Sequence, residues 1–415
     1  MVVVGRAGRV RWGCDRVMNA QHRQGALRGV RVIDAGQIIA GPFAATLLGE
    51  FGAEVIKVEQ PRVGDQGRGG EIPSPEFAQN ARNKKSITLD LRRPEGQALF
   101  KRLVAVADVV VENVRPGTLE RWGLGYEELA AVNPGIVMLR VSGYGQTGPY
   151  RHKYSFDRIG MAFGGLTYVT GYPDRPPVRP GFFIADYVAG LWGAFGVLAA
   201  LHHRDHTDGR GQMIDVSLYE AVWRLSGPLA ANYAAKGIVR ERQGNTMPGV
   251  VPAEQFETAD SRFLVLHAGT DRVFQRLCAV MDRPDLAADP RFARRSERVN
   301  HATELHALIG AWVRERTLDE ALAALEAGGV PASPVYSIAD IFRDPHFAAR
   351  ENLIRVADRV LGEMVQPGVV PKLSHTPGTV DRGAPLLGEH NEEVYLGLLD
   401  LSPTAYARLC REGVI

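Results

Sequence analysis

Apolar residues in the first half of the chain gather in short runs that are separated by longer segments of mixed polarity. The runs are rich in Val and Ile, as is typical of strands buried on both faces of a parallel sheet. We expect strands at Val30–Ala35, Glu54–Glu59, Ser86–Leu91, Asp108–Val114 and Gly135–Ser142. Helices are expected between them at Phe43–Phe51, Pro94–Ala107 and Thr118–Ala131. This alternation predicts βαβ units, and hence an α/β fold with a parallel, doubly wound sheet.

The pattern changes in residues 143–185, which Gly, Pro and Tyr interrupt. An uncharged apolar segment then predicts a long helix over about Tyr187–His203. Its uncharged part, Tyr187–Leu201, is too short to cross a bilayer, so we expect a buried helix whose glycines permit close contacts. A strand at Gln212–Val216 and a helix from Leu218 are expected to follow.

The remaining residues indicate a second, smaller α+β domain and a return to the first. Residues 235–260 have the composition of a loop, and the prolines of Val330–Tyr336 indicate an edge strand or a linker. Between them we expect a strand at Phe263–Ala268 and helices at Asp271–Met281, Arg298–Arg314 and Leu318–Ala327. The expected division is an N-terminal extension 1–28, the first part of the large domain 29–224, the small domain 225–340 and a return to the large domain 341–415.

Composition and charge exclude several classes of protein. Lys and Arg number 49 against 47 Asp and Glu, and the resulting net charge of +2 gives no support to a nucleic-acid partner. The three cysteines, Cys14, Cys278 and Cys410, are too few and too far apart for a disulfide framework or a four-thiolate zinc site. A reducing cytoplasm is therefore the expected location. We expect no membrane partner, because no run of about 18 uninterrupted apolar residues occurs.

The N-terminal residues 1–28 are rich in Arg and contain only a short apolar run, VVV. A secretory signal needs a longer apolar core, so this class of leader is not expected. A mitochondrial transit peptide is one alternative, and we favour an extension ahead of the first domain.

A ligand is expected beyond the carboxyl ends of the parallel strands. The loops there contain neither GxGxxG nor GxxxxGK[ST], so they lack both the dinucleotide fingerprint and the P-loop. They are instead basic, and guanidinium groups bind phosphate bidentately, which favours a ligand with several phosphates. The basic residues are Arg62, Arg68, Arg115 and Arg121, with Lys84, Lys85 and Arg92 flanking the third strand. For any one of these residues, the alternative is that it is a surface charge exposed to solvent and binds no ligand.

Four motifs in these loops and strands resemble those of a known family. They are AGPxxxxxLGxFGAEVIKVE from Ala40, RNKKSITLDLRRPEG from Arg82, DVVVENVRPGTLERWGLGY from Asp108 and LRVSGYGQTGPY from Leu139. With later segments such as GFFIADYVAG and APLLGEHNEEV, they resemble the class III CoA-transferases. This group includes formyl-CoA transferase, carnitine CoA-transferase and the α-methylacyl-CoA racemases. The resemblance extends from about residue 28 to the C-terminus.

The resemblance implies a fold, an assembly and an activity. The fold is a Rossmann-like large domain formed by both ends of the chain, with a smaller domain between them. Two chains interlock in a homodimer. The activity is CoA transfer from an acyl-CoA donor to a carboxylic acid acceptor, with the CoA thioester as substrate, no tightly bound cofactor and no metal. A dicarboxylate thioester such as succinyl-CoA is the expected donor, and Arg179 and Arg140 are candidates to bind its second carboxylate.

The family's covalent nucleophile matches Asp186, in GFFIADYVAG. A carboxylate there attacks the thioester, and the released thiolate then converts the mixed anhydride into an aspartyl-CoA thioester. Covalent catalysis of this kind divides one difficult exchange into easier steps. From the residues alone, the alternative is that Asp186 is only the N-cap of the following helix.

The family's CoA contacts match residues in four loops, and two positions depart from the formyl-CoA transferase pattern. Ile39 and Ala40 match the contacts to the pantetheine or thioester, and Leu89 and Arg92 those to the adenine and its phosphates. The pyrophosphate contacts match Asn113, Val114 and Arg115, and a further phosphate contact matches Arg121. Ile39 replaces a glutamine and Gln60 a basic residue, which argues against formyl or oxalyl transfer and favours a larger or more apolar acyl group.

Asp157 matches a second acidic position, near the CoA thiol in the transferases. Racemases have a histidine just before it, whereas this chain has Phe156, which cannot exchange a proton. We therefore favour transfer over a 2-methylacyl-CoA racemase, and a CoA-binding protein without catalysis is the other alternative. A structural salt bridge from Asp157 to Arg158 or Arg140 is the alternative to a catalytic role.

Histidines raise the question of a metal site. His202, His203 and His206 lie near the predicted end of the long helix, and an i, i+4 pair of histidines can bind a metal ion. No acidic or cysteine partner motif lies nearby, so we favour a solvated helix end.

Overall fold

The computed structural model describes residues 25–70 and 73–415. The expectations for the N-terminal extension and for Cys14 therefore concern, almost entirely, residues outside the described part. A six-stranded parallel sheet forms the centre of the larger body, with the order β3-β2-β1-β4-β5-β6. Its strands are β1 Arg31–Asp34, β2 Glu54–Glu59, β3 Lys84–Thr88, β4 Val109–Glu112, β5 Val137–Ser142 and β6 Met213–Ser217. The order reverses between β1 and β4, where ligands bind in sheets of this kind.

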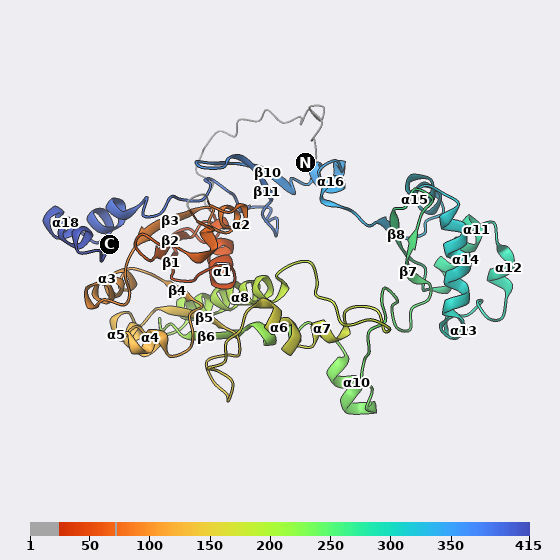
Figure 1. Ribbon diagram of the computed structural model, residues 1–415, viewed down its shortest axis with the longest axis horizontal. Coiled ribbons are helices and arrows are strands. Elements are labelled where there is room, and N and C mark those ends of the chain that lie inside the picture. Colours follow the sequence, from red (N-terminus) through yellow and green to blue (C-terminus); the bar gives the residue numbers. More distant parts are fainter. Residues whose placement is uncertain (1–24, 71–72) are drawn as a thin grey trace.

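Helices cover both faces of this sheet because alternate strand residues point to opposite sides. Ile33, Ile56 and Val110 belong to one apolar cluster, and Val32 and Val55 belong to the other. The first cluster packs against α3 Pro94–Val104, α4 Thr118–Arg121 and α5 Tyr126–Val132. The second packs against α1 Ala40–Glu50, α8 Ile184–His206 and α9 Leu218–Trp223. The chain is therefore α/β, with a buried parallel sheet between two helical layers (Figure 1).

A separate core forms around a three-stranded antiparallel sheet, which Figure 1 shows apart from the six-stranded sheet. Its strands are β7 Ala253–Glu257, β8 Phe263–His267 and β9 Ala332–Pro334, in this order. The helices packed around it are α11 Asp271–Val280, α12 Pro284–Ala288, α13 Arg295–Asn300, α14 Ala302–Arg314 and α15 Leu318–Ala327. β9 lies at an edge, as the prolines of its segment predict.

Arg298 is completely buried in this second core. Its guanidinium donates to the backbone oxygens of Val251 (2.9 Å) and Phe292 (2.8 Å), and it pairs with the Asp271 carboxylate at 2.8 Å. It also lies over the ring of Phe274, 4.5 Å from the centroid. One side chain therefore joins loops that are distant in sequence.

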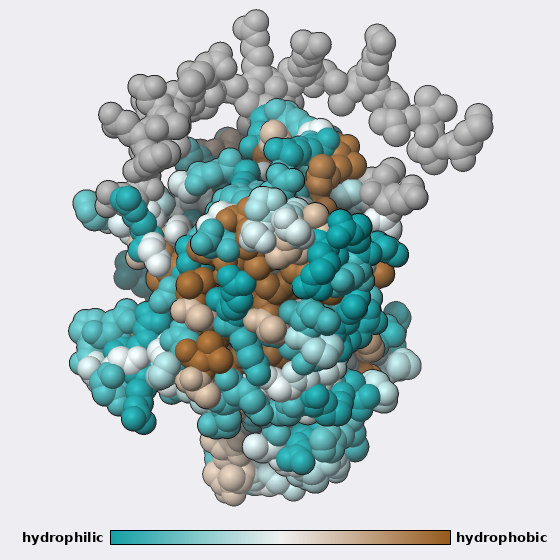
Figure 2. Space-filling view, turned by 90° about the vertical axis from the view of Figure 1, so that its left-hand side faces the viewer, coloured by the Kyte–Doolittle hydropathy of each residue, from teal (hydrophilic) through white to brown (hydrophobic). Residues whose placement is uncertain are grey.

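The C-terminal segment returns to the six-stranded sheet. A hairpin, β10 Leu353–Asp358 and β11 Gly362–Pro367, is followed by the π-helical segment Glu393–Leu398 and by α18 Pro403–Arg411. Tyr395 and Leu409 join the apolar cluster beneath α3. Seen from the side on which α3 and α18 lie, hydrophobic residues gather in the middle of a largely hydrophilic surface (Figure 2).

His390 extends the edge of β3. Its backbone N–H donates to the Ser86 oxygen at 2.9 Å, and its ring Nδ1 accepts from the Ser86 N–H at 3.2 Å. The ring thus occupies the place of a neighbouring strand's carbonyl.

Short elements complete the chain. They are the 3₁₀ turn Gln66–Arg68, α2 Pro75–Asn80, α6 Asp157–Phe163, α7 Leu166–Val169, α10 Leu229–Lys236, α16 Ile338–Ile341 and α17 Pro345–Ala349. The β10–β11 hairpin, β7, α6 and α10 are among the elements that the sequence pattern did not predict.

Several predicted elements differ from the structure in their bounds or continuity, as one strand and two helices illustrate. The third strand begins and ends earlier, at Lys84–Thr88, because buried ion pairing admits a lysine to its first position. The helix predicted at Thr118–Ala131 is broken into α4 and α5, where Gly123 adopts a positive φ of 63°. The helix predicted at Arg298–Arg314 is broken at His301, between α13 and α14.

The long helix α8 has 23 residues and begins three residues before the predicted start. It alone among the described helices is long and apolar enough to cross a membrane, so the expectation that the apolar segment is too short was wrong about its length. Its inner face packs on α1 and β5, and Gly190 and Gly193 approach Ala40 and Leu139 closely. Leu191, Phe195 and Leu198 on its outer face are exposed.

Candidate active site

The carboxyl ends of β1, β4 and β5 surround a cavity of about 320 Å³, here called the catalytic cavity. Its position at the reversal of strand order is where an open parallel sheet leaves a crevice between diverging loops. The lining residues are Gln37–Ala40, Asn113–Pro116, Val141–Gly143, Arg151, Lys153–Phe156, Asp186 and Leu218. Asp186 is the one carboxylate among them.

A second, smaller cavity of about 80 Å³ adjoins it at the ends of β2 and β3. Gln37 and Val114 line both cavities. The remaining lining residues are Ala35, Val58–Gln60, Leu89–Arg92, Leu119 and Trp122. A ligand can therefore extend from the ends of the outer strands to Asp186 past a shared pair of residues.

The two cavities bring together most of the catalytic and binding residues that the sequence predicted. Six of those residues line the catalytic cavity, namely Ile39, Ala40, Asn113, Val114, Arg115 and Asp186. Leu89 and Arg92 line the second cavity, where Arg92 forms a bidentate pair with Asp90. Arg121 lies outside both linings and donates to the Thr118 hydroxyl at 3.1 Å.

Asp186 lies in the first turn of α8, three residues after the N-cap, Phe183. The alternative that Asp186 is itself the N-cap is therefore wrong. Burial, together with repulsion from the neighbouring carboxylates of Asp157 and Glu76, raises its pKa to about 7. Asp186 is thus a basic carboxylate in a cavity that reaches the surface.

Asp157 supports the start of α8 from beneath. Its Oδ1 accepts the backbone N–H groups of Ala185 at 2.8 Å and Asp186 at 3.2 Å, two of the donors that a helix N-terminus leaves free. Burial raises the pKa of Asp157, although these two hydrogen bonds oppose the change. Its Oδ2 is buried and has no hydrogen-bond partner among the described residues.

The alternative of a salt bridge from Asp157 is also wrong, because none joins it to a basic residue within the described ranges. Arg140 instead pairs with Glu112 at 2.6 Å and Glu120 at 2.5 Å, and it is almost completely buried. Arg140 is therefore not available to bind a substrate carboxylate either. Arg158 is exposed.

The loop between β1 and α1 has an unusual backbone at Ile38, with a φ of 66°. A β-branched residue rarely adopts this left-handed conformation, which costs about 1–2 kcal/mol. Surrounding groups hold it in place: Asp65 Oδ1 accepts the Ile38 N–H at 2.9 Å, and the Asn113 side chain exchanges two 2.8 Å hydrogen bonds with the Gln37 backbone. The wall of the catalytic cavity that this loop forms is therefore rigidly supported.

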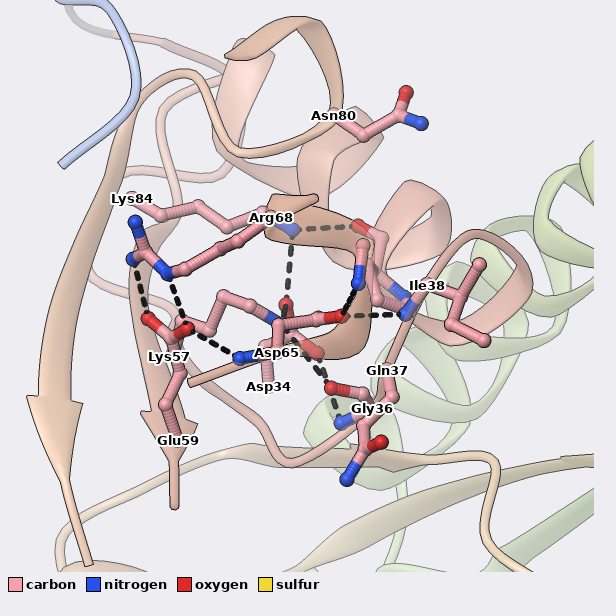
Figure 3. Close-up of polar contacts among 12 residues, drawn as sticks. Asp34, Gly36, Gln37, Ile38, Lys57, Glu59, Asp65, Arg68, Asn80 and Lys84 are labelled. Carbon is pink, nitrogen blue, oxygen red and sulfur yellow. Dashed lines mark hydrogen bonds and ion pairs between the residues drawn. The ribbon is translucent and has the colours of Figure 1, made fainter. Parts of the chain in front are cut away.

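Beneath this loop lies a network of buried charges, shown in Figure 3. Lys57 Nζ lies 2.6 Å from Asp65 and 3.6 Å from Asp34, and Lys84 Nζ lies 2.9 Å from Asp34. Burial opposes the charged form of Lys57, but the two carboxylates outweigh it and raise its pKa. Two ammonium groups and two carboxylates balance one another, so the buried charges are compensated.

This network corrects part of the phosphate-binding prediction. Lys84 is completely buried, and Arg68 is held by Glu59 at 2.7 Å. Lys85 is paired with Glu54 and Glu393. These three residues hold the loops in place and are not free to bind a phosphate.

The sequence did not single out Gln37, Ile38, Arg151 or Lys153, which also line the catalytic cavity. The first two lie in the post-strand loop where a ligand was expected, but no local signal reveals the left-handed residue because isoleucine seldom adopts it. Arg151 and Lys153 form a short basic run after β5, without a recognisable motif.

No group of three potential metal-binding side chains occurs among the described residues. His206 Nδ1 lies 2.8 Å from the His202 backbone oxygen, which directs one ring of that pair back to its own helix.

Comparison with known proteins shows which family the chain belongs to. A model of CoA-transferase family III matches residues 27–391. Succinyl-CoA–D-citramalate CoA-transferase of Chloroflexus aurantiacus is 48% identical, covering 96% of this chain and 100% of that protein. Succinate–glutarate CoA-transferase of Agrobacterium fabrum is 36% identical, covering 92% and 98%.

Solved structures show the same fold. A CAIB/BAIF family protein from Brucella suis has a TM-score of 0.81 and 35% identity, covering 90% of this chain and 100% of that one. Rv3272 from Mycobacterium tuberculosis has a TM-score of 0.79 and 31% identity, covering 88% and 98%. The chain therefore belongs to CoA-transferase family III and is a CoA-transferase.

Proposed function

We propose that the chain moves CoA from an acyl-CoA donor to a carboxylic acid acceptor by a ping-pong reaction through Asp186. The observation that supports this most is that Asp186 is the one carboxylate lining the catalytic cavity. Burial and repulsion raise its pKa to about 7, which increases its basicity and hence its nucleophilicity.

In the first half-reaction, an ionised Asp186 oxygen attacks the thioester carbonyl carbon and the C–S bond breaks. The products are a mixed anhydride and CoA thiolate. The thiolate then attacks the Asp186 carbonyl carbon, which breaks the anhydride C–O bond and releases the first carboxylate. The aspartyl-CoA thioester remains, and an acceptor carboxylate takes up CoA by the same steps in reverse.

We place CoA along the two adjoining cavities. The adenine end lies in the second cavity against Leu89, and the pantetheine passes Gln37 and Val114 toward Asp186. Arg115 and Arg121 are exposed and bind phosphate in this proposal. Arg92 exchanges its present partner, Asp90, for phosphate, at modest cost because the pair is exposed.

The proposed donor is succinyl-CoA and the proposed acceptor another dicarboxylic acid. Relatives at 45–48% identity are named for succinyl-CoA with D-citramalate or L-malate, and a relative at 36% for succinate and glutarate. Racemase chemistry is disfavoured because Phe156, at the place of the expected histidine, lines the cavity and supplies no acid or base.

The proposed assembly is an interlocked homodimer. Leu191 and Phe195 on α8 are 57% and 63% exposed, and with Phe51, Val370 and others they line an almost wholly apolar hollow. Apolar surface of this kind is typical of an interface between chains. Relatives named as alpha and beta subunits show that two different chains are the alternative.

Three further proposals concern the whole chain. The chain divides into a Rossmann-like large domain, 29–224 and 341–415, and a small domain, 225–340. It acts in the cytoplasm, for which the free thiols of Cys278 and Cys410 are the support. It works without a tightly bound cofactor.

The test is intact-protein mass spectrometry after brief incubation with succinyl-CoA. The wild type is expected to gain the mass of CoA less water, at Asp186, and to lose it when an acceptor acid is added. Asp186→Ala is expected to bind CoA without forming the adduct, and Asp174→Ala, an exposed aspartate outside the cavity lining, serves as the control. An equal adduct on Asp186→Ala, or CoA binding by the wild type without any adduct, would contradict the proposal.

A further inference from the structure

Three basic side chains line the catalytic cavity together with Asp186: Arg115, Arg151 and Lys153. Within residues 25–70 and 73–415, none of the three forms an ion pair with a carboxylate. Most other cations at these loops are already paired, including Lys57, Arg68, Lys84, Lys85 and Arg140. The cavity therefore presents unneutralised positive charge beside a single carboxylate, which favours an anionic ligand.

Contacts to aromatic rings and backbone hold these three exposed side chains in place. The Arg115 guanidinium donates to the His152 backbone oxygen at 2.9 Å and stacks 3.9 Å from the ring centroid of Tyr154. Lys153 Nζ lies 3.6 Å from the ring centroid of Tyr150. Cation–π contacts of this kind orient a cation without neutralising it.

The aromatic platform beneath Lys153 is itself anchored. Tyr150 makes edge-on contacts with Tyr144 and Phe163, both at 6.0 Å between ring centroids. Arg151 Nε donates to the His152 ring at 3.0 Å. The loop that carries Arg151 and Lys153 is therefore organised before a ligand binds, which reduces the entropy lost on binding.

These cations do not serve the nucleophile itself. Among the described residues, no ion pair joins Asp186 to Arg115, Arg151 or Lys153, although all four line one cavity. The Asp186 carboxylate and the basic groups therefore lie apart within that cavity. A substrate with its reacting carbonyl at Asp186 and a second negative charge farther along the acyl chain matches this arrangement.

We propose that Arg151 and Lys153 form a subsite for the distal carboxylate of the acyl group, which makes the enzyme selective for dicarboxylic acids. This proposal rests on the transfer function proposed above. Arg115 follows Val114, which lines both cavities, so we assign Arg115 to the CoA phosphates. Arg140 is excluded by its two glutamate partners, and Arg179 is not among the residues that line the cavity.

The same subsite selects both substrates. In a ping-pong reaction the donor acyl group and the acceptor acid occupy one site in turn. A monocarboxylic acid would leave Arg151 and Lys153 without an anion, and binding it would remove water from two unpaired charges. Monocarboxylic acids are therefore disfavoured in both half-reactions, because they lack the charged contact with Arg151 and Lys153.

The test compares succinyl-CoA with butyryl-CoA, which has the same number of acyl carbons but no distal carboxylate. The variants are Arg151→Gln, Lys153→Met and both together, with Lys153→Arg to retain the charge. Arg210→Gln, an exposed arginine on the turn before β6, is the matched control. For each single variant, kcat/KM for succinyl-CoA is expected to fall about 10–100-fold, as for loss of a charged hydrogen bond. The value for butyryl-CoA is expected to stay within about threefold, because that substrate makes no such bond.

Each other outcome overturns the proposal. An equal fall with both donors, together with weaker CoA binding, would assign these cations to the CoA phosphates. No change with either donor would show that they do not contact the substrate. Loss of succinyl-CoA preference in Lys153→Arg as well would indicate a disturbed loop. Failure of the wild type to form aspartyl-CoA with either donor would refute the transfer function, and the subsite with it.

Discussion

Replacing Asp186 by asparagine is expected to stabilise the protein, by an amount that grows with pH. The unfolded chain has an ordinary aspartate pKa near 3.8, whereas burial raises the pKa of the folded carboxyl to about 7. The folded state therefore binds the proton more tightly than the unfolded state. As pH rises from 3.8 to 7, the native protein progressively loses stability relative to a variant without this group, and the loss is constant at higher pH.

The magnitude follows from the size of the shift. A difference of about three pKa units corresponds to about 4 kcal/mol, at about 1.4 kcal/mol for each unit. We therefore expect Asp186→Asn to gain about 4 kcal/mol in unfolding free energy over the wild type between pH 4 and pH 8.

The assay is urea-induced unfolding of both proteins at several pH values and one protein concentration. Taking the difference between the two proteins cancels the titration of all other groups, and Asp174→Asn controls for an exposed carboxylate. A difference between wild type and Asp186→Asn that does not change with pH would refute the reasoning, because it would mean that Asp186 has the same pKa in the folded and unfolded states.

Two further changes test other parts of the fold. Arg298→Met removes the donor to the buried oxygens of Val251 and Phe292, so it is expected to lower the free energy of unfolding by about 3 kcal/mol. Amide hydrogen exchange is expected to become faster in α11 first, and unchanged exchange there would contradict this prediction. Burial lowers the pKa of His390 below 6.5, so the folded state resists its protonation and loses stability as pH falls below 6.5. In thermal unfolding, the difference in melting temperature between the wild type and His390→Asn is therefore expected to decrease between pH 7 and pH 5. A difference that stays constant over this range would contradict the prediction.

Local patterns in the sequence were sufficient for the parallel sheet. Buried strands appear as runs of Val and Ile, and β2 matches its prediction at both ends. The family could also be recognised, because several of its motifs lie in the loops that line the two cavities. Element boundaries were less accurate where a charge is buried, as at Lys84, since its partner Asp34 lies 50 residues away in the sequence.

The candidate site, too, could be predicted from the sequence only in part. The sequence placed Asp186 before a helix, but α8 begins earlier because Asp157, from another element, accepts its first N–H groups. The raised pKa of Asp186 depends on burial and on two carboxylates brought near by folding. Sequence distance carries no information about such neighbours.

By itself, the sequence determined the alternation of strands and helices, the family and the residue types available for catalysis. Only the tertiary structure decided which cations are free. Arg68, Lys84 and Arg140 form ion pairs with buried carboxylates, whereas Arg151 and Lys153 line the cavity with Asp186. The physical reason is that hydrophobic periodicity is local, whereas the compensation of a charge depends on which loops the folded sheet brings together.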